Sequence, residues 1–344
     1  MIPLVSVIVV NHNGIVFVDA CLRSILNSSY AELEIIFVDN ASSDRSLKYV
    51  KDNFSLDKRL KFIENSGSLG PAVGRNMGAR VSRGKYLVFF DNDTRVDNKC
   101  VAELVKVLEN DHGVGAGQAK LLRIGTENLY DCAGDYLGPL GFLIERSRGA
   151  KDVGQFNSIT NILSAKSAAS IIRRDLFNKI GGFDEDFYMY LEETDLSWRV
   201  WLAGFKVVFI PSAVVHHAFN TPKKQIKDKY YYQRNIVRYY GCRNYISTLI
   251  KNLELPDLLK ILPIHIGCWL LLSLLFLLKR EPRDAFYILK GIGWNILNFD
   301  ILLNKRRNII REIAGYDILD KIMDKQRLHY YVGKAFAYLS GKAF

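Results

Sequence analysis

Cysteine is scarce in this sequence, with five residues in 344, and none of the five belongs to a Cys-x-x-Cys pair. Scattered cysteines argue against a disulfide framework and against a zinc site, because both need cysteines at short, regular spacings. Isolated thiols are typical of proteins in reducing compartments. The sequence therefore predicts a protein of the cytoplasm.

We also expect no secretory signal peptide. No cationic segment precedes the first apolar run, Leu4–Val10, and the run itself is too short for a signal peptide. The sequence has no evident internal repeat, and its composition of 49% hydrophobic and 24% charged residues is that of a folded protein. We expect one large domain with an appendage, or two modest domains.

Net positive charge is missing from the first part of the chain, where 25 Lys and Arg face 26 Asp and Glu, and is concentrated in the last third. Residues 1–220 carry a net charge of −1, whereas residues 221–344 hold 22 Lys and Arg against 10 Asp and Glu, a net charge of +12. This asymmetry predicts an anionic partner for the last third, either a membrane surface or a nucleic acid. We therefore expect two regions, 1–220 and 221–344.

The basic region contains an apolar run, residues 261–278, that carries no formal charge. The run has about the minimum length that spans a bilayer, and Pro263 and His265 interrupt it. Its basic flanks, together with the Tyr-rich segment 223–243, suit an interfacial helix equally well. We expect membrane association, either peripheral or through one short embedded helix; the alternative is a helix buried against the domain.

The first half of the sequence alternates strand-like and helix-like segments at the spacing of βα units. The expected strands are Leu4–Val10, Leu33–Val38, Leu60–Glu64 and Tyr86–Phe90. The expected helices are Phe17–Asn27, Asp44–Asn53, Pro71–Ser82 and Asn98–Asn110. The less regular part that follows contains expected strands at Gln118–Ile124, Ser167–Ile172 and Lys206–Ile210, and a helix at Thr194–Ala203. This order predicts an α/β fold with a mostly parallel, doubly wound sheet.

Two carboxylates, Asp91 and Asp93, directly follow the most apolar of these strands. Open α/β sheets bind their ligands at the carboxyl ends of the strands. Hard divalent ions such as Mg²⁺ and Mn²⁺ take carboxylate oxygens and share their other positions with phosphates, so the pair suits a nucleoside diphosphate. The alternative is a polar turn after a strand.

Two further elements carry chemical groups. Glu192 and Glu193 stand at the start of a predicted helix, where one of them could act as a general base, although acids also stabilise a helix N-terminus. Their side chains point about 100° apart on a helix, so one of the two faces a given substrate. His216 and His217 follow a strand-like segment, and a neutral imidazole can complete a metal site made of carboxylates.

Six motifs in this order resemble glycosyltransferase family 2, specifically the rhamnosyltransferase-like and polysaccharide-assembly members with the GT-A fold. The motifs are Val5–Gly14, Val38–Asp44, Gly74–Gly78, Phe90–Thr94, Glu192–Leu196 and His217. The resemblance implies a nucleotide-sugar site that contains Asn11, Asp39, Arg75, Asn76, Asp91 and Asn92. It also implies that Asp93, Asp91 and His217 hold Mg²⁺ or Mn²⁺, and that Glu193 is the base, with Glu192 as the alternative.

The reaction implied by the resemblance is metal-dependent and inverting. A base deprotonates an acceptor hydroxyl, which displaces a nucleoside diphosphate from the anomeric carbon of a sugar in one step. Similar enzymes use basic, apolar C-terminal regions to sit on the cytoplasmic face of a membrane beside lipid-linked acceptors. We therefore expect a lipid-linked saccharide or a growing glycan as acceptor.

Three other functions fit parts of the sequence. A polyprenyl-phosphate sugar synthase shares the implied fold and metal and differs in its acceptor. A non-catalytic nucleic-acid or membrane-binding protein would explain the basic segment 223–243, but not the acidic motifs between residues 39 and 195. A dinucleotide-dependent oxidoreductase is disfavoured, because no Gly-x-Gly-x-x-Gly turn follows the first strand.

Overall fold

A computed structural model describes residues 2–67, 69–126, 128–218, 227–324 and 328–339. The chain forms two compact units. The first comprises Met1–Asp135 and Glu145–Thr221, and the second comprises Tyr136–Ile144 and Pro222–Phe344. We expected a single boundary at residue 220, whereas in the structure Tyr136–Ile144 also belongs to the second unit.

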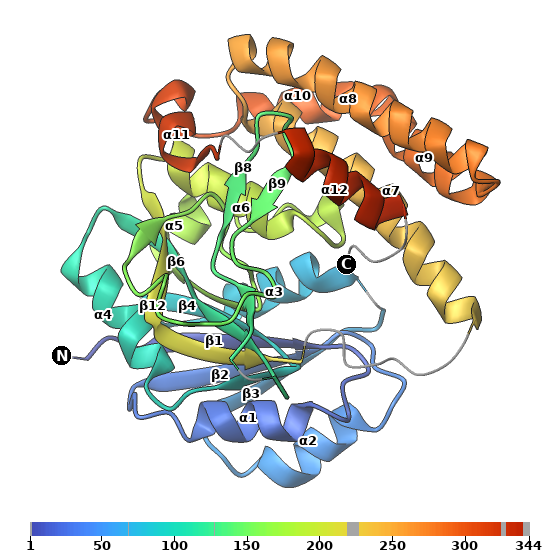
Figure 1. The fold of residues 1–344 in the computed structure, drawn as a ribbon. Coiled ribbons are helices and arrows are strands. Elements are labelled where there is room, and N and C mark those ends of the chain that lie inside the picture. The colour runs from blue at the N-terminus through green and yellow to red at the C-terminus, as the bar shows by residue number, and fades with distance from the viewer. Residues whose placement is uncertain (1, 68, 127, 219–226, 325–327, 340–344) are drawn as a thin grey trace. The chain divides into compact units, whose positions relative to one another are not determined.

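A mixed β-sheet of ten strands, counted over the described residues, forms the centre of the first unit. Eight strands follow the order β10-β12-β6-β11-β4-β1-β2-β3, while β5 pairs with β12 and β7 pairs with β6 (Figure 1). The four strands at one end of this order are parallel to one another, and β11 runs antiparallel between β4 and β6. The strands are β1 (Val5–Asn11), β2 (Leu33–Asp39), β3 (Leu60–Glu64), β4 (Tyr86–Asp91), β5 (Thr94–Val96), β6 (Val114–Arg123), β7 (Tyr130–Cys132), β10 (Thr160–Asn161), β11 (Ala169–Arg173) and β12 (Lys206–His217). A separate two-stranded sheet pairs β8 (Asp135–Leu137) with β9 (Leu143–Glu145).

The expected α/β architecture is confirmed, and the four parallel strands lie within one residue of their predicted bounds. Three of them end one residue later than expected, on Asn11, Asp39 and Asp91. These polar residues keep the strand pairing because the neighbouring parallel strand continues beside them. The expected strand Lys206–Ile210 was too short, since β12 pairs with β6 through to His217 and also pairs with β5 over Val215–His217.

Helices cover both faces of this sheet (Figure 1). The apolar sides of α1, α2 and α4 share one buried core with alternate residues of the central strands, including Val7, Phe37 and Val88. Helix α3 lies on the opposite face, where Gly74 and Gly78 allow its backbone to approach Val10 and Ile8 closely. The helices of this unit are α1 (Val18–Leu26), α2 (Ser46–Phe54), α3 (Gly70–Val81), α4 (Cys100–Asn110), α5 (Arg174–Lys179), the 3₁₀ turn η1 (Glu185–Phe187) and α6 (Glu192–Leu202).

The second unit is helical and has its own core. Helix α9 packs against both α7 and α8, around buried side chains that include Cys242, Trp269, Phe276 and Ile288. The helices are α7 (Lys227–Asn252), α8 (Leu255–Leu278), α9 (Pro282–Leu297), α10 (Phe299–Arg307), α11 (Gly315–Ile322) and α12 (Leu328–Leu339). By length and composition α8 is apolar enough to cross a membrane, and 28% of its most apolar window is buried. Residues 223–226 of the expected basic segment lie outside the described residues.

Candidate functional site

The carboxyl ends of β1, β2 and β4 bring polar residues from three motifs together. Asn11 is paired in register with Asp39, and its neighbour Val10 is paired with Asp91. The buried Asn11 amide donates to Asp39 Oδ1 at 2.9 Å and accepts from Asn92 Nδ2 at 2.6 Å. Asn11 thus links the end of β2 to the turn after β4, and a contact of these residues with a nucleotide stays a prediction.

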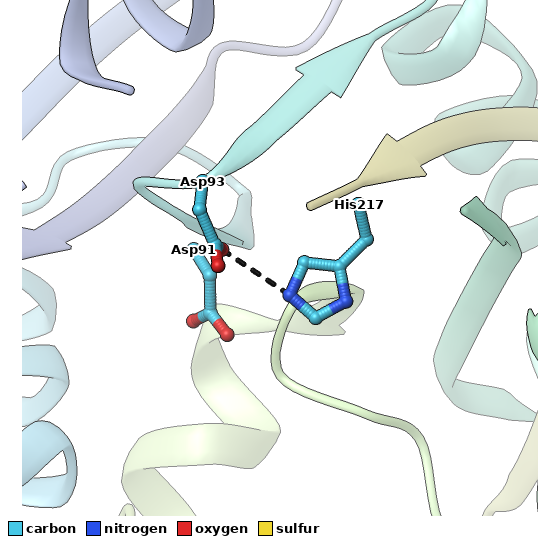
Figure 2. A group of neighbouring side chains, drawn as sticks. All are labelled: Asp91, Asp93 and His217. Atoms are coloured by element: carbon cyan, nitrogen blue, oxygen red, sulfur yellow. Dashed lines mark ion pairs between the residues drawn. The ribbon is translucent and has the colours of Figure 1, made fainter. Parts of the chain in front are cut away.

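Asp91, Asp93 and His217 form a compact group in which one ligand atom from each residue lies within 4.8 Å of the others. Figure 2 shows the Asp93 carboxylate and the His217 ring facing each other, with Asp91 beside them. Strand β5 produces this arrangement, because its first residue, Thr94, is paired in register with His217 on β12. The register therefore brings together groups that are far apart in the sequence.

A fourth residue, Asp131 on β7, orients the histidine. His217 Nδ1 lies 2.9 Å from Asp131 Oδ2, and His217 Nε2 lies 3.2 Å from Asp93 Oδ1. Burial lowers the pKa of His217, but its hydrogen bonds with Asp131 and Asp93 outweigh burial and raise the pKa to about 10. A carboxylate behind a ligating imidazole is the usual outer partner of a metal site. Two carboxylates and an oriented imidazole therefore fit a Mg²⁺ or Mn²⁺ ion.

Arg75 on α3 connects this group to the acidic start of α6. Its guanidinium donates to Asp91 Oδ1 and to Glu192 Oε1, each at 2.8 Å. Glu192 is buried, and its Oε2 has no hydrogen-bond partner within the described part of the chain. Burial, together with the neighbouring Glu193, raises the pKa of Glu192 to about 7, and Arg75 opposes this increase. Arg75 thus forms ion pairs with the carboxylates of both Asp91 and Glu192.

Asn76, also expected near the donor, holds a protein loop. Its Nδ2 donates to Phe183 O at 2.8 Å and to Glu185 Oε1 at 2.9 Å, and its Oδ1 accepts from Phe183 N. Both ends of the amide are therefore engaged with the segment that leads to α6. A nucleotide contact of Asn76 stays a prediction, whereas its role in holding this loop is evident from the hydrogen bonds.

The segment before α6 has an unusual backbone. Tyr188, Tyr190 and Leu191 all have positive φ angles, which are unfavourable for residues with a Cβ atom. The segment packs against Gly70, where a Cβ would overlap the Tyr188 carbonyl oxygen. Strain of this kind persists where the surrounding structure enforces it and is common at functional sites. This backbone segment places Glu192 and Glu193 in the first turn of α6, and the sequence also predicted the two acids at a helix start.

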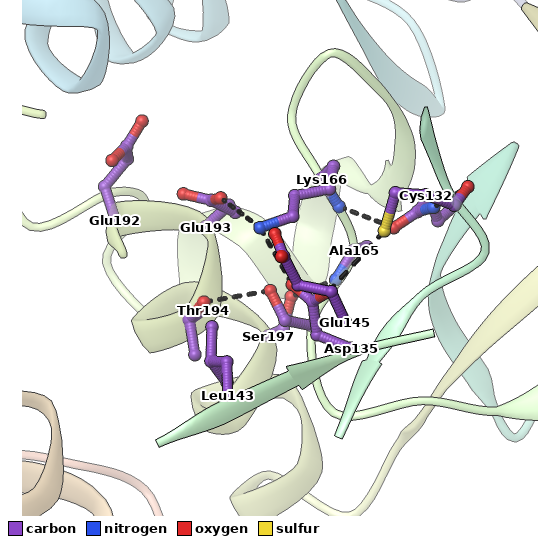
Figure 3. A network of polar contacts seen from close by, with 12 residues as sticks. Cys132, Asp135, Leu143, Glu145, Ala165, Lys166, Glu192, Glu193, Thr194 and Ser197 are labelled. Carbon is purple, nitrogen blue, oxygen red and sulfur yellow. Dashed lines mark hydrogen bonds and ion pairs between the residues drawn. The ribbon is translucent and has the colours of Figure 1, made fainter. Parts of the chain in front are cut away.

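Glu193 faces a lysine that no motif indicated. Lys166 Nζ lies 3.6 Å from Glu193 Oε1 and 2.8 Å from Asp135 Oδ2 (Figure 3). The carboxylates of Glu192 and Glu193 point in different directions in this view, as expected for adjacent helical residues. Sequence reasoning missed Lys166, Asp131 and Asp135, because each stands alone between ordinary neighbours and gains its partner through the fold.

The chain belongs to glycosyltransferase family 2: the model of "Glycosyl transferase family 2" matches residues 6–181. Two uncharacterised glycosyltransferases of Haemophilus influenzae are similar to it. One is 27% identical over 329 residues, covering 90% of this chain and 98% of the relative; the other is 30% identical over 109 residues, covering 31% of this chain and 44% of the relative. The chain thus spans less than half of the second relative.

A third relative matches a short stretch at higher identity. It is an N-acetylglucosaminyl-diphospho-decaprenol L-rhamnosyltransferase of Mycobacterium tuberculosis, 48% identical over 48 residues, which cover 14% of this chain and 16% of the relative. Among solved structures, a mannosyltransferase of Pyrobaculum calidifontis, determined with GDP-Man and Mn²⁺, has a TM-score of 0.57 at 18% identity. That match covers 99% of this chain and 88% of the mannosyltransferase, and it supports a GT-A-like fold.

Proposed function

We propose that this protein is a metal-dependent, inverting glycosyltransferase that moves a sugar from a nucleoside diphosphate to a hydroxyl of a lipid-linked saccharide or growing glycan. The observation that carries the proposal is the bridge made by Arg75 between Asp91 and Glu192. This bridge joins a group suited to a divalent cation with a pair of candidate bases, which are the two parts that the reaction needs.

In this proposal Asp91, Asp93 and His217 hold Mg²⁺ or Mn²⁺, with Asp131 orienting the histidine. The bound ion supplies positive charge against the departing diphosphate. The solved mannosyltransferase with GDP-Man and Mn²⁺ has a similar fold, which supports a cation and a nucleotide sugar here. Asn11, Asp39 and Asn92 line the neighbouring strand ends and are the proposed nucleotide-binding residues.

We assign the base to Glu193. Glu192 is committed to Arg75, whereas Glu193 is free of that ion pair and keeps its carboxylate partly accessible, with 15% of the side chain exposed. Glu193 takes the proton of the acceptor hydroxyl as the oxygen attacks the anomeric carbon. The bond to the diphosphate breaks with its electron pair on the phosphate oxygen. A single displacement of this kind inverts the anomeric configuration.

A binding experiment tests the donor site. Calorimetry with UDP, dTDP and GDP, each with Mn²⁺ or with EDTA, is expected to show metal-dependent binding of one nucleotide. That nucleotide would identify the class of donor. If folded protein bound none of the three under either condition, the glycosyltransferase proposal would be contradicted.

The second unit presents the surface that we propose to meet a membrane. Large apolar side chains are exposed along α8 and continue over α9 and α10. They are Leu255, Leu259, Ile264, Leu270, Leu271, Leu274, Leu277, Leu278, Phe286, Leu289, Ile296, Leu297, Phe299 and Ile301. An exposed apolar area of this extent, with basic residues such as Lys279, Arg280 and Lys290 beside it, suits an anionic lipid surface.

The opposite side of α8 is joined to another segment of the second unit through His265, whose Nδ1 lies 2.8 Å from Leu140 O. Within α8 itself, Trp269 Nε1 donates to His265 Nε2 at 2.9 Å and so orients the imidazole. A helix anchored in this way on one side and apolar on the other favours an interfacial position over a separate span. A peripheral site on the cytoplasmic face agrees with the five cysteines, all of which are free. The rhamnosyltransferase relative, whose name includes a decaprenol diphosphate, supports a lipid-linked acceptor.

The Leu271→Glu/Leu274→Glu variant tests this surface. Each leucine contributes about 1.5–3 kcal/mol when it leaves water, so binding to phosphatidylglycerol-containing vesicles is expected to fall at least about tenfold. Sedimentation with vesicles measures the change. The control, Leu56→Glu/Val153→Glu, replaces exposed apolar residues of the first unit and should bind as the wild type does. Undiminished binding of the α8 variant would contradict a membrane role for this surface.

A further inference from the structure

The segment that carries Lys166 is attached to the helix that carries Glu193. Ala165 N donates to Ser197 Oγ at 3.1 Å, and the hydroxyl groups of Ser164 and Thr194 lie 3.0 Å apart (Figure 3). On the other side, Lys166 N donates to the buried Gln118 Oε1 on β6 at 2.9 Å. The backbone of Lys166 is therefore fixed relative to both the sheet and the first turns of α6.

The Lys166 side chain extends between two carboxylates. Its ammonium lies 2.8 Å from Asp135 Oδ2 and 3.6 Å from Glu193 Oε1. Asp135 is completely buried and accepts a further contact from Cys132 Sγ at 3.5 Å. The buried Asp135 thus holds the ammonium from one side, and the ammonium in turn faces the more accessible Glu193.

The charges around Glu193 come from several elements. Glu192 and Arg75 lie on one side; Lys166, Asp135 and Glu145 lie on the other, and Glu145 is paired with Arg148 at 2.7 Å. Burial lowers the pKa of Lys166, but Asp135, Glu193 and Glu145 outweigh burial and hold it well above its usual value. Lys166 therefore presents a positive charge to Glu193.

We propose that Lys166 is a positioning residue that holds the Glu193 carboxylate oriented toward the acceptor, an inference that rests on the proposed role of Glu193 as the base. The ion pair at 3.6 Å restrains the carboxylate at Oε1, and the backbone contacts of Lys166 hold the cation in place. Lys166 transfers no proton itself. The proton passes from the acceptor hydroxyl to Glu193, and the ion pair with Lys166 weakens as Glu193 becomes neutral.

The test removes the cation without leaving a buried charge unpaired. Lys166→Met alone would leave the buried Asp135 carboxylate without its cation and could prevent folding. The Lys166→Met/Asp135→Asn variant removes both charges and preserves the net charge of the chain. The matched control is Lys120→Met/Asp152→Asn, which removes another lysine–aspartate pair (2.7 Å) whose lysine side chain is 9% exposed, against 22% for Lys166.

The assay follows release of nucleoside diphosphate from the donor identified by calorimetry, with Mn²⁺ present and water as the acceptor. For Lys166→Met/Asp135→Asn kcat is expected to fall about tenfold or more, because the base is no longer held in position, while the KM for the donor stays unchanged. Metal-dependent nucleotide affinity should also stay unchanged, and the control pair should keep the wild-type kcat.

Three results separate the inference from the proposed function. A folded double variant with the wild-type kcat would overturn the role of Lys166. A raised KM for the donor with an unchanged kcat would also overturn it, since that would make Lys166 a contact for the donor. Failure of the wild type to release nucleoside diphosphate would instead contradict the proposed function. In a Glu193→Gln background, the Lys166 and Asp135 substitutions should cause no further loss of kcat.

Discussion

Glu193→Gln is expected to lower the transfer rate by about 10²–10⁴-fold while donor binding remains unchanged. Glutamine has nearly the shape and volume of glutamate, so the substitution changes the packing in the first turn of α6 and beside Lys166 very little. It cannot accept a proton from the acceptor hydroxyl. The rate of nucleoside diphosphate release measures the first effect, and calorimetry with the nucleotide and Mn²⁺ measures the second.

Glu192→Gln distinguishes the two adjacent acids. Glu192 accepts from Arg75 at 2.8 Å, so its substitution disturbs the link to Asp91 and should affect donor binding as well as rate. Normal transfer by Glu193→Gln, together with intact donor binding and a large loss of rate in Glu192→Gln, would move the base to Glu192.

Asp93→Ala is expected to abolish the difference in nucleotide affinity between Mn²⁺ and EDTA. The carboxylate lies 3.2 Å from His217 Nε2 and belongs to the group suited to a cation. Without it, a divalent ion keeps one carboxylate and one imidazole, which is a poor site for a hard cation. Because metal stabilisation of the leaving group amounts to several kcal/mol, the transfer rate should fall about 10³-fold or more.

Asp97→Ala is the matched control for this variant. Asp97 lies four residues further along the chain, is 54% exposed and pairs with His216, outside the proposed cation site. It should bind nucleotide and Mn²⁺ as the wild type does. Metal-dependent binding that persisted in Asp93→Ala would show that the cation is held elsewhere, and the assignment of Asp91, Asp93 and His217 would then be wrong.

The parallel half of the sheet was predictable from the sequence because its signal is local. A strand buried on both faces needs a continuous apolar run, and an amphipathic helix needs apolar residues at helical spacing, so each element can be recognised from its own residues. Asp91 and Asp93 were identifiable for the same reason, since they interrupt an apolar run at the end of β4. Antiparallel β11 and the short β5, β7 and β10 carry weaker signals, because their pairing depends on partners far away in the chain.

The candidate site could be predicted as a set of residues but not as a set of contacts. The motifs indicated Asp93, His217, Glu192 and Glu193, yet they did not indicate that Arg75 would join Asp91 to Glu192. Asn76 was expected near the donor, and its amide instead holds the loop before α6. A motif identifies which chemical groups are present, whereas hydrogen-bond partners depend on which elements pack together.

The contacts of Asp131 and Lys166 could not be predicted from neighbouring residues in the sequence. Asp131 reaches His217 because β7 and β12 both pair with β6, and Lys166 reaches Glu193 because Ser164 and Ala165 are hydrogen-bonded to α6. Hydrophobic periodicity and short motifs are properties of neighbouring residues, so the sequence is enough to predict the α/β class, the acidic strand end and the basic, apolar last third. Distances between side chains depend on strand register and on helix packing over long separations, and for that reason they come from the folded chain.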